Sequence, residues 1–101
     1  MAQQAAVVYV MQPIGAHQND GSISSATSFT APDNANAVLM SALTQNVIFT
    51  LDGTTPTASV GLTLKAGDSA IMVPVYGGQV IKVIEATASA SINLQFVKFG
   101  G

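Results

Sequence analysis

Apolar and polar residues alternate along much of the chain with a period of two. The clearest run extends from Val47 to Asp52. Successive side chains of a β-strand point to opposite faces, so this alternation predicts a strand that has one face in a core. The residues expected on the core side are Val47, Phe49 and Leu51, and those expected on the other side are Ile48, Thr50 and Asp52.

Further segments after residue 25 predict strands by the same alternation or by β-prone composition. They are Ala26 to Thr30, Ala37 to Leu43, Gly61 to Lys65, Ala70 to Val75, Val80 to Ala86 and Ser91 to Phe99. The side chains expected inward include Phe29, Leu62, Leu64, Ile92, Leu94 and Phe96, and those expected outward include Asn93, Gln95 and Val97. Ala37 to Leu43 also has a composition that a helix tolerates, but its short length and polar flanks favour a strand.

Turn signals separate these segments. Asp52-Gly53, Pro56 and Ala66-Gly67 interrupt the alternation, as does the stretch from Tyr76 to Gln79. Pro74 cannot donate a ladder hydrogen bond, so its segment is expected at a sheet edge or at a bulge. Six to eight short strands at this spacing predict an all-β fold, either an antiparallel β-sandwich or a small jelly-roll-like barrel.

The first 24 residues differ from the rest, and we expect them to form an N-terminal arm or edge strand followed by a long loop. Ala5 to Met11 is apolar on both faces, and Gln12 to Ser25 is rich in turn residues. The sandwich domain itself is predicted to span residues 25–101. A doubly apolar strand on a long tether suggests an assembly interface made by Val7, Val8, Tyr9 and Val10, which would pack on a neighbouring subunit. The alternative is an ordinary edge strand of the same domain.

Charge is scarce in this sequence. It has three Lys and Arg residues in total and five Asp and Glu, so that 8% of the residues are charged, against about 25% in typical soluble domains. So few basic residues disfavour nucleic-acid binding. No apolar run is long enough to span a membrane as a helix, and the N-terminus lacks the features of a signal peptide. We therefore expect synthesis in the cytoplasm and a surface that other protein covers. The alternative explanation of the surface is a soluble monomer kept in solution by hydroxyl and amide groups.

Candidate catalytic residues are few and scattered. The one histidine, His17, lies in the long N-terminal loop without a positioned partner, and the carboxylates are mostly turn-type Asp residues. Neither Asn19-Asp20-Gly21 nor Asp52-Gly53 completes a calcium loop, and there is no cysteine. The sequence thus predicts no enzyme activity, no cofactor, no metal site and no small-molecule substrate.

One long segment resembles a known class of protein. Within Asn46 to Phe99, the pieces Thr50 to Thr57, Gly61 to Leu64, Ala66-Gly67, Ile81 to Ile84 and Ala86 to Ser91 follow one another in a characteristic order. This order resembles the small β-sandwich structural proteins of tailed bacteriophage virions. The first 35 residues carry no matching piece.

The resemblance implies a virion structural protein, namely a head decoration or cement protein that stabilises the capsid lattice. Its expected partners are itself, for example as a trimer, and the major capsid protein or another virion protein. Tail and neck components use similar folds and are one alternative. The other is a module that binds carbohydrate or a host surface through loops such as Asp52 to Ser59 and Tyr76 to Gln79.

Overall fold

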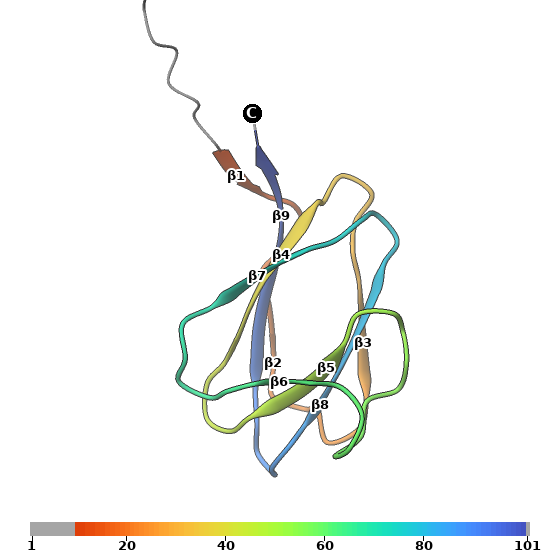
Figure 1. The fold of residues 1–101 in the computed structure, drawn as a ribbon. Coiled ribbons are helices and arrows are strands. Elements are labelled where there is room, and N and C mark those ends of the chain that lie inside the picture. The colour runs from red at the N-terminus through yellow and green to blue at the C-terminus, as the bar shows by residue number, and fades with distance from the viewer. Residues whose placement is uncertain (1–9, 101) are drawn as a thin grey trace, which may run out of the picture.

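The computed structural model describes residues 10–100, and these form nine strands in two antiparallel sheets (Figure 1). The first sheet has the order β1-β9-β4-β7, and β2 also pairs with β9. Its strands are β1 (Val10–Pro13), β2 (Gln18–Asp20), β4 (Ala37–Ala42), β7 (Ile71–Pro74) and β9 (Ile92–Gly100). The second sheet has the order β3-β8-β5-β6. Its strands are β3 (Thr27–Thr30), β5 (Val47–Thr50), β6 (Leu62–Leu64) and β8 (Val80–Glu85).

A single hydrophobic core lies between the two sheets. Every second residue of the central strands β4, β9, β5 and β8 is buried in it, as alternation requires. The cluster includes Val38, Met40, Val47, Phe49, Ile81, Val83, Ile92, Leu94 and Phe96. This arrangement confirms the predicted β-sandwich.

Most predicted strands are present close to their predicted bounds. The segment whose composition would also suit a helix forms the strand β4. Pro74 lies in an edge strand, as expected. One expectation was wrong, because the stretch predicted as a loop from residue 12 to residue 25 contains β2 and the end of β1. β2 has the sequence Gln-Asn-Asp and therefore no apolar alternation, and its position comes from pairing with β9.

Several side chains are more exposed or more buried than the sequence predicted. Leu62 is 55% exposed although Leu64, on the same face of β6, is 3% exposed. On the outward face of β5, Ile48 and Thr50 are each 7% exposed, because the loop after β5 returns over them. The Thr50 hydroxyl donates a hydrogen bond to the Thr54 carbonyl oxygen, and the Gly61 backbone lies directly against the Ile48 side chain.

β1 and the end of β9 extend beyond the sandwich as a two-stranded projection (Figure 1). Val10 pairs with Gly100, three residues past Val97, where the pairing of β9 with β4 begins. Asn36 ties this projection to the sandwich by bonding both the backbone N–H and the carbonyl oxygen of Phe99. Of the predicted interface residues, Val10 is 57% exposed in β1, and Val7, Val8 and Tyr9 lie outside the described residues.

Candidate functional site

The predicted candidates for chemistry do not come together. His17 is exposed, and its Nε2 atom lies 3.0 Å from the Asn93 side-chain oxygen, which also accepts a hydrogen bond from Asn19. This group orders the start of β2 against β9. Within residues 10–100, no three His, Cys, Asp or Glu side chains are grouped so that they could hold a metal ion. The described residues contain no helix that is long and apolar enough to cross a membrane.

Asp52 has a structural use in the loop that follows β5. Its carboxylate accepts a hydrogen bond from the Thr54 backbone N–H at 3.0 Å, which is the side-chain-to-backbone bond typical of an Asp turn. Bonds from the Thr54 side chain and backbone stabilise the ionised form and lower the pKa of Asp52 below its ordinary value. Asp20 makes the same kind of bond to the Ser22 N–H at 2.8 Å.

The lowered pKa of Asp52 gives a testable pH dependence. A depressed pKa means that this carboxylate stabilises the fold above its unfolded pKa, and that the contribution disappears as the pH falls through the folded pKa. We expect Thr54→Ala, which removes the side-chain bond, to raise the Asp52 pKa toward 3.8. An NMR titration of the carboxyl carbon in both proteins measures this change. Equal pKa values in the two proteins would show that the Thr54 hydroxyl does not bond to Asp52.

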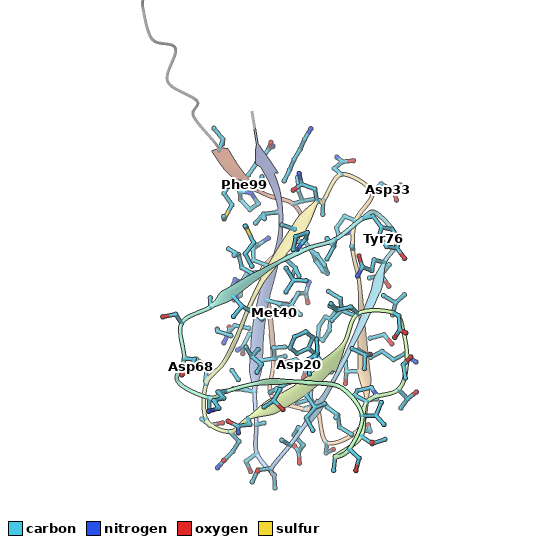
Figure 2. The ribbon with its side chains drawn as sticks, in the orientation of Figure 1. Asp20, Asp33, Met40, Asp68, Tyr76 and Phe99 are labelled. Atoms are coloured by element: carbon cyan, nitrogen blue, oxygen red, sulfur yellow. The ribbon has the colours of Figure 1, made fainter. Side chains whose placement is uncertain are left out.

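The turn from Tyr76 to Gln79 is also occupied by structural contacts. The Gln79 side chain accepts a hydrogen bond from the Tyr76 N–H at 3.1 Å and donates one to the Leu51 carbonyl oxygen at 2.9 Å. The backbone of this turn bonds to Ala31 on the neighbouring chain segment, and Figure 2 shows Tyr76 and Asp33 at the same end of the molecule. Tyr76 is 69% exposed, and every other aromatic side chain among the described residues is buried or partly buried, so a stacking platform for a sugar is not formed here.

The most distinctive surface is the side of the sandwich formed by the edge strands β6 and β7. These strands follow each other in the chain but belong to different sheets, joined by the turn that carries Asp68 (Figure 2). Exposed apolar side chains gather on and beside them, namely Val60, Leu62, Ile71 and Met72. We call this set the β6/β7 edge. Exposed apolar groups beside an open strand are a feature of interaction surfaces.

The backbone of β7 is not free to accept another strand along its whole length. The Val75 N–H bonds to the Asn36 carbonyl oxygen, so the backbone groups of Val75 are directed toward the neighbouring strand β4 and not toward the open edge. Backbone groups alternate in direction along a strand, and Pro74 therefore faces the open edge. Because proline has no N–H, this edge lacks a donor at that position.

β6 has no such block. The Ala86 N–H bonds to the Asn46 carbonyl oxygen, so the backbone hydrogen-bonding groups of Asn46 are directed toward β8. Those of the next residue, Val47, are therefore directed toward β6. Val47 pairs with Leu64 and Phe49 pairs with Leu62, which leaves the backbone N–H and carbonyl of Thr63 directed to the open side. Thr63 is exposed.

Two hollows adjoin β6. One, of about 680 Å³, lies between β6 and β7 and is lined by Thr63, Leu64, Lys65, Asp68, Ser69 and Ile71. The other, of about 490 Å³, lies between β6 and the loop after β5, where Val60 and Leu62 form part of its wall. The β6/β7 edge is therefore both apolar and indented, which suits it to contact with an extended chain segment.

Sequence reasoning predicted the arm but not the β6/β7 edge. Leu62 was expected to face the core, because alternation marks the face of a strand and not the position of that strand in its sheet. The only local sign of an edge was Pro74. Comparison of the chain with protein-family models, characterised proteins and solved structures gives no match.

Proposed function

We propose that this chain is a structural protein of a virion, a head decoration or cement protein that stabilises the capsid lattice through protein–protein contacts. The observation that carries the proposal is the β6/β7 edge, an exposed apolar surface on a sandwich with very few charges. The resemblance of residues 46–99 to the small sandwich proteins of tailed-phage virions supplies the context.

The physical chemistry of the surface suits permanent contact with other protein. Covering charged groups costs desolvation free energy, and a surface with few charges loses little when it is covered. Permanent interfaces commonly bury more than about 2,000 Å² in total and are rich in apolar groups. With a net charge of −2, copies of the chain also repel one another weakly.

The shape also suits a structural role. Among the described residues, every buried side-chain nitrogen or oxygen atom has a hydrogen-bond partner. Pro56 is fully buried, which anchors the longest loop to the body. A sandwich held in this way acts as a stiff block whose edges and projection meet its neighbours.

The experiment compares particles made with and without this chain. Particles are purified after infection with a phage whose genome encodes the chain, and with the same phage carrying a stop codon at Gln12. We expect the chain in the normal particles in many copies, and we expect the particles without it to release their genome at lower temperature. Adding back the purified protein should restore the normal temperature, and a heat-denatured sample serves as the control. Absence of the chain from purified particles would contradict the proposal.

The alternatives give different results in the same system. Antibody labelling at the tail or the neck, with unchanged head stability, would favour a tail or neck component. Binding to a glycan array, lost when the loop after β5 is altered, would favour the carbohydrate-binding module.

A further inference from the structure

We propose that the open edge of β6 accepts an additional β-strand, and that this strand is residues 5–9 of a second copy of the chain. The inference names the partner of the β6/β7 edge, and its biological meaning rests on the structural role proposed above. Strand addition combines backbone hydrogen bonds with side-chain burial in alternate pockets.

The acceptor has the two features that strand addition needs. The N–H and carbonyl of Thr63 point away from β5, and Thr63 is an exposed residue, so an incoming strand can bond to them. Beside them, Leu62 is 55% exposed at the hollow next to the loop after β5, and Ile71 is 37% exposed at the hollow between β6 and β7. A strand laid along β6 would adjoin both hollows.

The donor is defined by its sequence. Residues 5–9 read Ala-Ala-Val-Val-Tyr and carry no charge and no proline. Val and Tyr favour strands, and in an extended segment Val7 and Tyr9 would share one face. That face is large enough to fill an apolar hollow, and a neutral segment can enter it without a charge desolvation cost.

The same copy cannot supply this strand. Val10 is held in β1 by pairing with Gly100, and β1 and β7 lie at opposite edges of their sheet. Three strand spacings separate these edges, a distance of about 14 Å. Tyr9 is bonded directly to Val10, and one residue spans at most about 3.5 Å. Tyr9 therefore cannot lie beside β6, which adjoins β7, in the same copy, and an added strand that includes Tyr9 must come from another copy.

The projection places the start of β1 where another copy can approach it. Val10 lies opposite Gly100, three residues beyond the last residue of β9 that pairs with β4. Three residues of strand correspond to about 10 Å. The segment before Val10 is thus joined to the body at the tip of the projection and not over the sandwich.

The test uses full-length variants that separate donor from acceptor. Thr63→Pro removes the open-edge N–H of β6 but no bond between β5 and β6, and Val8→Asp places a charge in the donor segment. Ser28→Pro is the matched control, on β3 at the opposite edge of the same sheet. The Ala31 N–H bonds to Gln79, and because backbone groups alternate in direction along β3, the N–H of Ser28 is directed to the open edge. Molecular mass is measured by light scattering over a range of concentrations.

We expect the unaltered chain and Ser28→Pro to associate equally. Thr63→Pro and Val8→Asp should each associate at least tenfold more weakly. Mixed in equal amounts, these two variants should form dimers, because one has an intact donor and the other an intact acceptor. A monomeric unaltered chain, unchanged association in either variant, or a mixture that stays monomeric would overturn the proposal.

A second pair of variants covers the case in which Thr63→Pro fails to fold. Leu62 and Leu43 are each 55% exposed, but only Leu62 belongs to the β6/β7 edge. Leu62→Asp should weaken association at least tenfold, and Leu43→Asp should leave it unchanged. Equal effects of the two would overturn the assignment of the acceptor. If purified particles contain the chain but the mixing test fails, strand addition alone is refuted. If the mixing test succeeds but purified particles lack the chain, the virion role alone is refuted.

Discussion

Leu94→Ala is expected to lower the free energy of unfolding by about 3 to 4 kcal/mol, since truncation of a buried leucine loses transfer free energy and leaves a cavity. Leu94 is 1% exposed and lies in β9 between β2 and β4, opposite Met40 of β4, which is fully buried. The strands on both sides of β9 limit how far the core can collapse into the space. Urea denaturation followed by circular dichroism measures the change.

Leu43→Ala is the control for this prediction, because the same side-chain change is made at a residue that is 55% exposed. We expect it to cost less than about 1 kcal/mol. A similar loss in both variants would mean that Leu94 does not occupy the core position described.

Gly77→Ala is the second change with a large expected effect, of about 2 to 3 kcal/mol, because it forces two backbone segments apart. A β-carbon at Gly77 would lie 2.7 Å from the Asp33 Cα atom and 2.8 Å from its carbonyl oxygen. Relief is costly, because Gly78 and Gln79 bond to the backbone of Ala31 at 2.8 Å on the same segment. The loss would appear as a lower midpoint in thermal and urea unfolding.

Gly21→Ala makes the same replacement where there is room. Its β-carbon would lie 3.9 Å from the Ser91 β-carbon, an ordinary contact. We expect a change of less than about 0.5 kcal/mol, as for most surface substitutions. If the two glycine variants had the same unfolding midpoint, the close approach of Gly77 to Asp33 would be refuted.

The fold was predictable from the sequence wherever one face of a strand meets the core. In β9, the alternation of Ile92, Leu94 and Phe96 with Asn93 and Gln95 predicted the buried face correctly. Val97 was expected outward and is 2% exposed. It lies between Pro13 of β1 and Ala37 of β4, and that pairing is a property of the whole sheet which the local pattern does not contain.

The two halves of the candidate site differ in what can be said of them. The arm was predicted from an apolar segment without charges, and it stays a prediction because residues 5–9 lie outside the described part of the chain. The acceptor was not predictable, because Leu62 and Leu64 have equivalent local sequence and differ only in their position relative to the edge of the sandwich. Their exposure depends on which strands lie beside β6, and that follows from the order β3-β8-β5-β6.

Pro74 has a consequence for symmetry. It removes one of the open-edge N–H donors of β7, whereas the open-edge donor of β6 is intact, so a strand that arrives on the side of β6 and β7 bonds better to the second sheet than to the first. The donor segment and the acceptor strand are then different surfaces of the same molecule, and copies meet head to tail. Contacts of this kind close into a ring when the rotation per copy divides a full turn, and otherwise continue as a filament. The angle between the β1 projection and β6 would therefore set how many copies complete a ring.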